Sequence, residues 1–556
     1  MKRFVALSLA AYASAAPAFN AETIHGDAAP ILSSANAEEV PGAYIIKFKD
    51  NVDEKTAADH HTWVKDIHDT WVKTFPGGKD ERILELRKRG LDLSLSDDVF
   101  RGLKHTYKIG NGFVGYAGHF DDSVIEQVRR HPDVEYIHRD TVVHTMKYET
   151  IKYDDIRVEK SECSPETEKG APWGLARVSH RKPLNFGTFN KYLYAEEGGE
   201  GVDAYVIDTG TNVDHVDFDG RAHWGKTIPQ GDQDIDGNGH GTHCSGTIAG
   251  KKYGVAKKAN VYAVKVLRSN GSGTMSDVIA GVEFAAQRHI EQVAAAKKGK
   301  RKGFKGSVAN MSLGGGKTTP LDAAVNAAVN AGLHFAVAAG NDNADACNYS
   351  PAAAANAVTV GASAIDDSRA YFSNWGKCTD IFAPGLNIQS TWIGSKSAIN
   401  TISGTSMASP HICGLLAYYL SLQPATDSEY SVAPITPAKL KSNLIAVSTV
   451  GTLTDIPAGT PNLLAWNGGG CSNYTSIVAE GSYDAAADKA AEKSTSDSVL
   501  DSVTELENAI ESDLKIVSGK VISGASSFGS KAHKFSEKIH DLVDEELKEF
   551  LEELKM

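Results

Sequence analysis

Cysteine is scarce in this sequence, which has six cysteines among 556 residues. So few cysteines exclude a small domain held by a dense set of disulfides, and the CxxC spacing of structural zinc sites is absent. Basic charge is also in short supply, because 57 Lys and Arg face 70 Asp and Glu, giving a net charge of −13. A chain without a basic surplus is a poor candidate for binding nucleic acid.

Long apolar runs are missing beyond the N-terminus, so no later segment has the roughly 20 apolar residues that a membrane-spanning helix needs. The first residues carry a shorter run. Lys2 and Arg3 precede the apolar residues 4–13, and Ala-Ser-Ala at 13–15 has the small side chains of a cleavage site. We interpret residues 1–15 as a signal peptide rather than an anchor helix, and expect the chain to enter the secretory pathway.

With 41% hydrophobic and 23% charged residues, the chain has the composition of a globular protein. Strand-like and helix-like segments over 43–146 predict a small α+β domain, and the charged residues 147–170 predict an exposed processing linker. Residues 171–468 alternate apolar strands with helices, which predicts an α/β domain with a doubly wound parallel sheet. Residues 469–556 are rich in Ala, Ser, Asp, Glu and Lys and predict a helical or disordered acidic tail.

The expected elements follow hydrophobic periodicity. In the small domain we expect strands at 43–49, 105–109, 113–120 and 134–143, and helices at 54–72 and 124–130. In the large domain we expect buried strands at 204–207, 261–267, 308–313, 333–338 and 358–360, and helices at 276–298 and 321–331.

Two polar residues stand at places where such a sheet builds sites. Asp208 ends the apolar strand at 204–207, and ligands bind at the carboxyl ends of parallel strands; taken alone, it is equally a loop or capping aspartate. His240 lies at a turn before a helix of unusually small residues, Gly-Thr-His-Cys-Ser-Gly. That setting favours a functional histidine over a stray surface or core one.

A serine and an asparagine complete the candidate set. Ser406, in Ser-Gly-Thr-Ser-Met-Ala-Ser-Pro-His, precedes a buried helix, where free N–H groups favour negative charge, although a plain N-cap serine has the same pattern. Asn341 follows the apolar strand at 333–338 and offers an amide donor for an oxyanion. A serine hydroxyl needs an imidazole base, which needs a carboxylate. The chain order Asp, His, Ser is that of the subtilisin triad, and no GxSxG elbow surrounds the serine.

These segments resemble the subtilisin-like serine proteases, more narrowly the proteinase K branch and its cerevisin-like vacuolar proteases of fungi. Ala-Pro-Trp-Gly at 171–174, Asn-Met-Ser-Leu-Gly-Gly at 310–315 and Phe-Ser-Asn-Trp-Gly at 372–376 extend the likeness. The resemblance implies a catalytic triad of Asp208, His240 and Ser406, with Asn341 in the oxyanion hole. The implied substrate-binding residues are Ser269, Asn270, Gly271, Ser272, Gly273, Ser312, Leu313 and Gly314 along the substrate backbone, and Ala338, Ala339 and Gly340 in the pocket wall.

The resemblance also implies how such a protease is regulated and what it cuts. Residues 43–146 look like an inhibitory propeptide, with self-cleavage between 143 and 171; a permanent regulatory domain is the alternative. Backbone pairing with substrate predicts broad specificity, and pocket walls of Leu, Ala and Gly favour apolar or aromatic side chains before the cut.

Further positions carry more local expectations. Cys347 and Cys378 flank neighbouring elements and form the favoured disulfide, although six cysteines allow many pairings. Cys244 resembles the free cysteine beneath the catalytic histidine of proteinase K relatives; a buried, inert thiol is the alternative. Asn473 is the favoured glycan acceptor. By analogy with the family, Asp380 is a candidate ligand of a structural calcium ion.

Two other motifs are excluded as ligand sites. Residues 232–237 begin like an EF-hand loop, but its twelfth position is His243, where calcium needs a glutamate. Gly316-Lys317 resembles the end of a phosphate-binding loop, but Met311 stands where a glycine is required.

The sequence thus predicts a monomeric serine endopeptidase made as a zymogen, with polypeptide substrates and its own propeptide as partners. It needs no cofactor beyond the structural calcium that Asp380 would bind, and no nucleic acid. A vacuole or lysosome-like compartment is favoured over secretion outside the cell. The alternative is a binding protein, either an inactivated protease scaffold or an inhibitor that works through 43–146.

Overall fold

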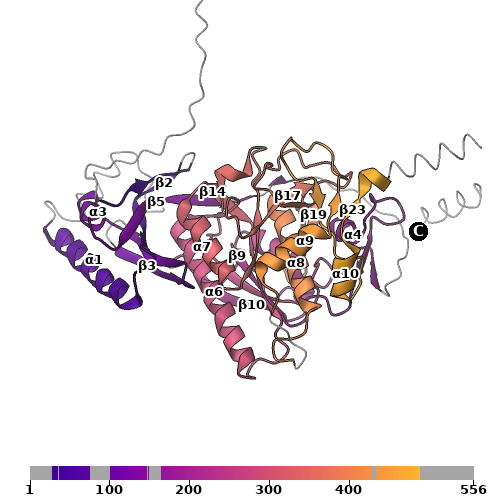
Figure 1. The fold of residues 1–556 in the computed structure, drawn as a ribbon, viewed down its shortest axis with the longest axis horizontal. Helices are drawn as coiled ribbons and strands as arrows, with labels where there is room; N and C mark the ends of the chain where they lie inside the picture. Colours follow the sequence, from indigo (N-terminus) through magenta and orange to yellow (C-terminus); the bar gives the residue numbers. More distant parts are fainter. Residues whose placement is uncertain are drawn as a thin grey trace, which may run out of the picture. The chain divides into compact units, whose positions relative to one another are not determined.

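The computed structural model describes residues 28–34, 37–74, 101–146, 148–149, 165–428 and 434–488 (Figure 1). The predicted signal peptide, most of the predicted linker and the tail beyond Asp488 lie outside these residues. The described residues up to Ala486 belong to one compact unit. Of the second unit, 487–556, the structure describes only Ala487 and Asp488.

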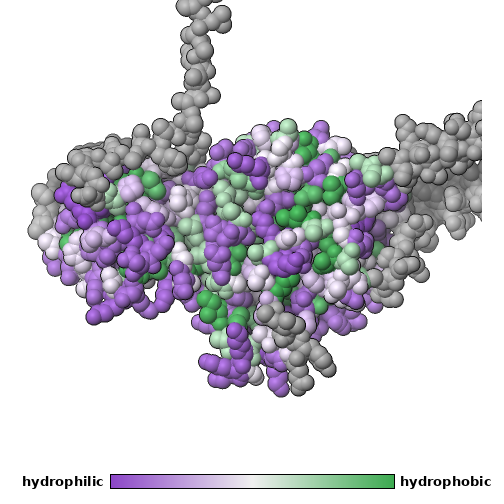
Figure 2. Space-filling view, in the orientation of Figure 1, coloured by the Kyte–Doolittle hydropathy of each residue, from purple (hydrophilic) through white to green (hydrophobic). Residues whose placement is uncertain are grey.

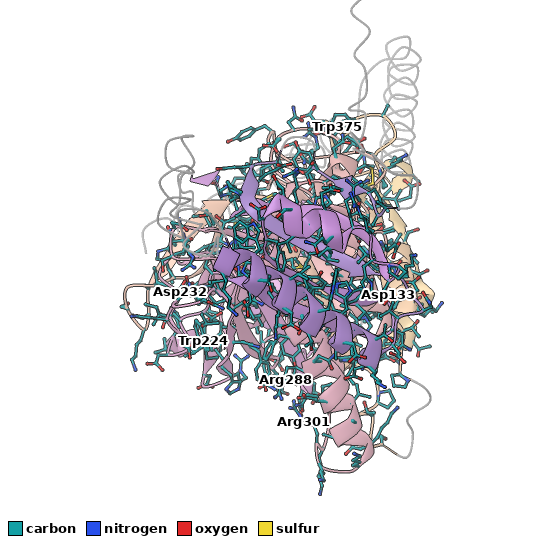
Figure 3. The ribbon with its side chains drawn as sticks, turned by 90° about the vertical axis from the view of Figure 1, so that its left-hand side faces the viewer. Asp133, Trp224, Asp232, Arg288, Arg301 and Trp375 are labelled. Carbon is teal, nitrogen blue, oxygen red and sulfur yellow. A yellow bond between two sulfur atoms is a disulfide. The ribbon has the colours of Figure 1, made fainter. Side chains whose placement is uncertain are left out.

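The N-terminal part of the large unit is a small α+β domain, as the sequence predicts. Its antiparallel strands are β2 (Glu39–Phe48), β3 (Gly102–Ile109), β4 (Phe113–His119) and β5 (Val134–Thr145), in the order β5-β2-β4-β3. Helices α1 (Glu54–Thr74) and α3 (Asp122–Val128) pack on one face of the sheet. They stand in front of it in Figure 3, and Figure 2 shows mainly hydrophilic residues over the outer side of α1.

A short strand before residue 43 also belongs to this sheet. The short strand β1 (Ile31–Leu32) pairs in parallel with β5, and the Ala29 N–H donates to the Arg129 carbonyl. Two residues are too few for periodicity to reveal, which is why the sequence places the boundary at 43 instead.

A ten-stranded sheet, in the order β10-β11-β9-β13-β15-β17-β18-β22-β21-β23, forms the core of the larger domain. Its parallel strands are β10 (Ala222–Thr227), β11 (Asn260–Lys265), β9 (Val202–Asp208), β13 (Gly306–Met311), β15 (His334–Ala338), β17 (Val358–Ser363) and β18 (Ile381–Pro384). The central strands β9, β15 and β17 are buried along their whole length because helices cover both faces, whereas the edge strand β10 is only partly buried. The predicted doubly wound α/β fold is confirmed.

Alternate residues of β9 illustrate the two layers. Ala204 and Val206 face the core that holds α5 (His240–Ala249) and α8 (Thr405–Ser421), whereas Tyr205 and Ile207 face the core that holds α6 (Met275–Lys297) and α7 (Thr319–Asn330). The chain leaves β9 toward β10 and β11 on one side and reaches β13 on the other, so the strand order reverses at β9. A crevice forms at the carboxyl ends of the strands at such a point.

The remaining described elements are α4 (Trp173–Ser179), α9 (Pro437–Ala446), α10 (Tyr474–Glu480) and the short strands β6 (Tyr148–Glu149), β7 (Glu166–Lys169), β8 (Lys191–Tyr194), β12 (Ser272–Thr274), β14 (Leu313–Gly316), β16 (Tyr349–Ser350), β19 (Ile388–Thr391), β20 (Ile399–Ser403), β21 (Thr449–Val450), β22 (Leu463–Leu464) and β23 (Tyr483–Asp484).

Two of these elements shift the predicted boundaries of the larger domain. Strand β7, in the predicted linker, pairs with β8, so the domain begins before 171. After the predicted end at 468, α10 buries Ile477 in the core and β23 joins the main sheet beside β21. The run of glycines at 468–470 marks a turn with positive φ angles rather than the start of a linker.

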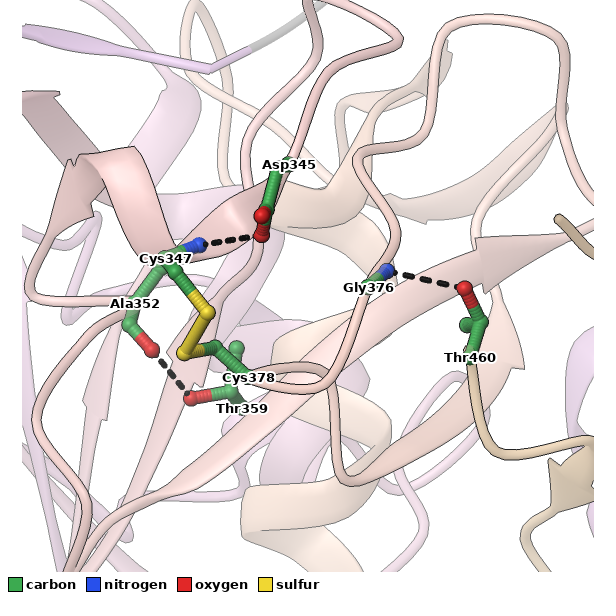
Figure 4. The surroundings of a disulfide bond; sticks show 7 residues. All are labelled: Asp345, Cys347, Ala352, Thr359, Gly376, Cys378 and Thr460. Atoms are coloured by element: carbon green, nitrogen blue, oxygen red, sulfur yellow. Dashed lines mark hydrogen bonds between the residues drawn. A yellow bond between two sulfur atoms is a disulfide. The ribbon is translucent and has the colours of Figure 1, made fainter. Parts of the chain in front are cut away.

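A disulfide joins Cys347 and Cys378, the pair that the sequence favours (Figure 4). It links the segment before β16 to the segment before β18. Cys244 and Cys413 are free and buried, and Cys471 is disulfide-bonded. Among the described residues, no helix has both the length and the apolar character that crossing a membrane would require.

Candidate active site

Asp208 and His240 meet at the carboxyl end of β9. Asp208 is the last residue of that strand and His240 the first of α5; both are completely buried. The His240 Nδ1 lies 2.8 Å from Oδ1 and 3.0 Å from Oδ2 of Asp208. An ionised carboxylate only accepts hydrogen bonds, so this contact assigns the proton to Nδ1. Nε2 is then an acceptor, as a general base requires.

Asp236 holds the first turn of α5 in place. Its carboxylate accepts hydrogen bonds from the N–H groups of Asn238, Gly239 and Thr242 and from the hydroxyls of Thr209 and Thr242. This carboxylate therefore joins the end of β9 to the start of the helix. We did not single out Asp236 from the sequence, although Asp-Gly-Asn-Gly before a helix is a turn and capping signal that could have identified it.

Ser406 is the second residue of α8, next to the first turn of α5. The Cys244 Sγ, one turn beyond His240, donates to the Ser406 carbonyl at 3.4 Å. The Ser406 hydroxyl donates to the Ser312 carbonyl at 2.9 Å. Within the described residues the buried His240 Nε2 has no hydrogen-bond partner. The structure thus brings two candidate residues into direct contact and sets the third beside them, with its hydroxyl turned to another acceptor.

Asn341 is oriented by the residue before the serine. Its Oδ1 accepts from both the Thr405 N–H, at 2.9 Å, and the Thr405 hydroxyl, at 2.8 Å. A backbone N–H can only donate, so the amide oxygen faces α8 and Nδ2 faces away. A side chain at Gly404 (φ 152°) would meet the Met146 carbonyl oxygen at 2.4 Å and the Asn341 Nδ2 at 3.3 Å. Because Gly404 has no side chain, the Met146 carbonyl oxygen and the Asn341 amide can both lie next to its Cα.

An extended segment of the N-terminal domain runs through this crevice. Strand β5 lies between β12 and β14, antiparallel to both, with His144 opposite Ser272 on one side and Gly314 on the other. The Thr145 N–H donates to the Gly271 carbonyl at 3.1 Å. Two residues beyond Met146, β6 pairs with β20. The chain therefore crosses the site as a substrate-like strand.

The predicted substrate-binding residues occupy four places near this strand and Ser406. Gly271, Ser272, Gly273, Leu313 and Gly314 border it directly. Ser269 and Asn270 lie in the turn before β12, where Asn270 Oδ1 accepts from the Ser272 N–H. Ser312 contacts Ser406, as above. Ala338, Ala339 and Gly340 end β15, and the Gly340 N–H donates to Thr405 Oγ1 at 3.2 Å.

His243, His411 and the Cys244 thiol, which lie near His240, are uncharged near pH 7. Burial lowers the pKa of His243 to about 3, and its Nε2–H donates to the Ile388 carbonyl at 2.8 Å. Burial also lowers the pKa of His411 to about 4 and raises that of the Cys244 thiol well above its usual range. The Asp208 carboxylate is thus the nearest group that can stabilise a positive charge on His240.

The profile of the subtilase family matches residues 199–462, and that of peptidase inhibitor I9 matches residues 43–146. Over all 556 residues of both proteins, the chain is 73% identical to the subtilisin-like proteinase Spm1 of Pyricularia oryzae. The chain belongs to the subtilase family.

A second curated relative agrees. The subtilase is 65% identical to alkaline protease 2 of Aspergillus fumigatus over 487 residues, which cover 88% of this chain and 93% of the relative. A crystal structure of a cold adapted subtilisin-like serine proteinase is 44% identical, covers 54% of this chain and 99% of the other, and superposes with a TM-score of 0.47. The protein is a subtilisin-like serine protease with an inhibitor I9 propeptide domain, which is the organisation of a zymogen.

The propeptide domain of this subtilase also contacts α6. Asp140 accepts from the Ser276 N–H at the start of that helix, and Lys108 donates from its N–H to Glu283. Asp277 receives a hydrogen bond from His105 at 2.8 Å and an ion pair from Lys104 at 3.0 Å. Burial alone would raise the pKa of Asp277, but these two partners outweigh it and hold the pKa at about 2. The contact therefore depends on an ionised Asp277.

Asp380 does not fit the calcium site that the family analogy predicts. Its Oδ2 forms an ion pair with Lys441 at 2.8 Å and accepts the Thr359 N–H at 2.8 Å. The residues present do not fit a calcium ion here, because the Lys441 ammonium lies at the carboxylate oxygen that would bind it. Sequence reasoning missed Lys441, which lies on a helix far along the chain.

Proposed function

We propose that Ser406 is the nucleophile of this protease and His240 its base and later its acid. Ser406 Oγ attacks the scissile carbonyl carbon while its proton moves to His240 Nε2, and Asp208 stabilises the resulting imidazolium. The new oxyanion accepts hydrogen bonds from Asn341 Nδ2 and from the free N–H of the first turn of α8. The carbon–nitrogen bond then breaks as Nε2 returns the proton to the leaving amine. Water, activated by the same base, releases the acyl group.

The observation that carries this proposal is the position of the Met146 carbonyl, held beside Asn341 at the start of α8 by a strand that pairs on both sides. The Ser406 hydroxyl must turn from the Ser312 carbonyl to His240 before it attacks. Such a rotation is expected, because catalytic hydrogen bonds often form fully only in the reactive complex.

A fluorophosphonate probe tests the proposal against the alternative of a binding protein. We expect the processed protein to be labelled at Ser406 and the Ser406→Ala variant to be unlabelled and unprocessed. Processed, folded protein that fails to react would instead indicate an inactivated scaffold, or an inhibitor that works through residues 43–146.

We propose further that the zymogen cleaves itself after Met146. This residue follows the last pair of β5 with β14, and its carbonyl is the one that faces Asn341. N-terminal sequencing of the mature enzyme should then give Lys147 or, after trimming, a later residue. A first cut elsewhere in 143–171 would contradict this assignment.

Broad specificity with an apolar or aromatic residue before the cut follows from the same contacts. The Met146 Sδ-methyl lies against Gly314, where an added Cβ would come within 2.6 Å of it, and the completely buried Val143 packs near Leu267 and Leu313. Most other contacts are to backbone, which any sequence supplies. A peptide library should show selection before the cut and at the position of Val143, and tolerance between them.

We also propose where the enzyme resides, that it is a monomer and that it carries a glycan. The signal peptide directs a monomeric enzyme into the secretory pathway, with the vacuole as the favoured destination. Asn473 is exposed at the start of α10, and its Oδ1 accepts the Ser476 N–H, which leaves Nδ2 for a glycan. Endoglycosidase treatment should lower the apparent mass of the wild type and leave that of Asn473→Gln unchanged.

A further inference from the structure

The ammonium group of Lys441 lies where three oxygen atoms converge. Lys441 is in the middle of α9, and its Nζ donates to the carbonyls of Ala355, at 3.0 Å, and Ala357, at 2.6 Å. The third oxygen is Asp380 Oδ2, at 2.8 Å. A lysine ammonium has three N–H donors, and each has an acceptor here.

These three acceptors have the chemistry of a calcium site. Calcium prefers carboxylate and backbone carbonyl oxygens at about 2.3–2.6 Å, usually with waters to complete six to eight ligands. The three oxygens lie 2.6–3.0 Å from Nζ, so a small inward shift would bring them to that range. The carbonyls come from the loop before β17, and Asp380 directly precedes β18. An ammonium group at the centre of these oxygens excludes a metal ion by its volume and by its charge.

We propose that Lys441 is a built-in cation that replaces a metal ion at Asp380, and that a divalent-cation site is exposed when its side chain is removed. Burial raises the pKa of Asp380, so its ionised form depends on a positive charge nearby. Unlike a bound ion, the lysine is covalently attached and remains in place at any calcium concentration.

The contact also has a mechanical role. It ties α9 to the connection between β16 and β17 and to the start of β18, two residues after Cys378 of the disulfide. Lys441 and Asp380 are about a fifth exposed, at 18% and 22% of their side chains, so the pair is shielded only in part. Its loss should therefore lower thermal stability measurably without preventing folding.

The test is thermal unfolding of the full-length chain carrying Ser406→Ala, which prevents self-digestion, in EGTA and in millimolar CaCl2. In the chain that keeps Lys441, calcium should raise the melting temperature no more than it does in the Asp380→Asn variant. Lys441→Ala should unfold about 5 °C lower in EGTA and regain most of that loss in calcium. The double variant Lys441→Ala/Asp380→Asn should regain nothing. Lys439→Ala removes the same charge from an exposed position of α9 and serves as the matched control.

Calorimetric titration with CaCl2 gives an independent readout. Lys441→Ala should bind one calcium ion more than the chain that keeps Lys441, and the double variant should lose it again. Calcium binding or stabilisation that needs Asp380 while Lys441 is present would overturn the proposal. An unchanged melting temperature of Lys441→Ala in EGTA would overturn it as well. If Lys441→Ala is destabilised but calcium does not raise its melting temperature, the proposed divalent-cation site is refuted.

Discussion

At the scale of single residues, the tautomer of His240 depends on one carboxylate. Asp208→Asn would offer an amide that can donate to Nδ1 and so favour the proton on Nε2, the atom that must accept from Ser406. We expect kcat to fall by about 10⁴-fold with little change in KM. Steady-state kinetics on a peptide substrate measures both constants, and an unchanged circular dichroism spectrum excludes misfolding. A loss below about tenfold would argue against this role.

The oxyanion donor permits a graded prediction. Asn341→Ala should lower kcat by about 10²–10³-fold. Thr405→Val keeps the N–H that orients the amide but removes the hydroxyl, so we expect a loss of about tenfold. Both variants should bind a substrate with nearly unchanged KM, because ground-state contacts remain. Equal falls in kcat in the two variants would indicate that Thr405 does more than orient the Asn341 amide.

Cys244 supports a prediction about inhibition. Its sulfur lies within 4.8 Å of a His240 ring nitrogen and 3.4 Å from the Ser406 carbonyl, so a mercurial on this thiol should displace the imidazole and abolish activity. Burial makes the reaction slow, since it raises the pKa of the thiol. Cys244→Ala should resist the reagent, and full activity of the modified wild type would refute the prediction.

The sequence predicts which single residues carry the chemistry better than it predicts which side chains contact each other. Asp208, His240, Ser406 and Asn341 follow strand ends and helix starts that periodicity locates. Lys441 acts on Asp380 from a helix about 60 residues later, and that contact exists only once α9 has packed. The analogy with calcium therefore failed where a distant side chain entered the site.

At the scale of elements, the propeptide helix α1 carries a pH dependence. His60 is buried among Phe48, Trp63, Tyr116 and His131, and burial holds its pKa at about 3; that of His61 is about 4. Both values lie below the unfolded value near 6.5, so the folded domain is fully stable above that pH. As the pH falls from 6.5 toward the folded pKa values, the domain loses up to about 1.4 kcal/mol per pH unit through His60, and less through His61, which water screens more.

We therefore expect the domain to loosen, and processing to finish faster, at pH 5 than at pH 7. Hydrogen exchange of the Ser406→Ala chain at both values measures the loosening. His60→Gln stays uncharged and can still bond to Tyr116, so it should respond less steeply to pH. Equal exchange at the two pH values would contradict the expectation.

Short edge strands show the limit of periodicity at this scale. The long strands and helices were predicted within a few residues, whereas β12 and β14 have three and four residues and no recognisable alternation. They are strands because other strands pair with them: β5 pairs with both, and β16 pairs with the far end of β14. Their register depends on a partner more than 120 residues earlier, and no local pattern contains that information.

At the scale of the whole molecule, the C-terminal end of the protease domain is part of its core. A chain that stops at 470 loses the buried Ile477, β23 and the bond from Arg181 to the Gly481 carbonyl. It also loses the disulfide-bonded Cys471. We expect the free energy of unfolding to fall by about 5 kcal/mol or more, so that little protein accumulates. A chain that stops at 488 is the control and should mature normally; equal yield of the two would contradict the prediction.

Strand β5 belongs at once to the inhibitor sheet and to the cleft. Each enzyme molecule is therefore made with one covalently attached copy of its own inhibitor, in a fixed ratio of one to one. Once the strand has been cut and the domain destroyed, no second copy can be drawn from the same chain. The first mature molecules can digest the inhibitor domains of molecules that are still inhibited. Protease activity in a population of zymogens should therefore rise steeply after a lag, and the rise should be irreversible.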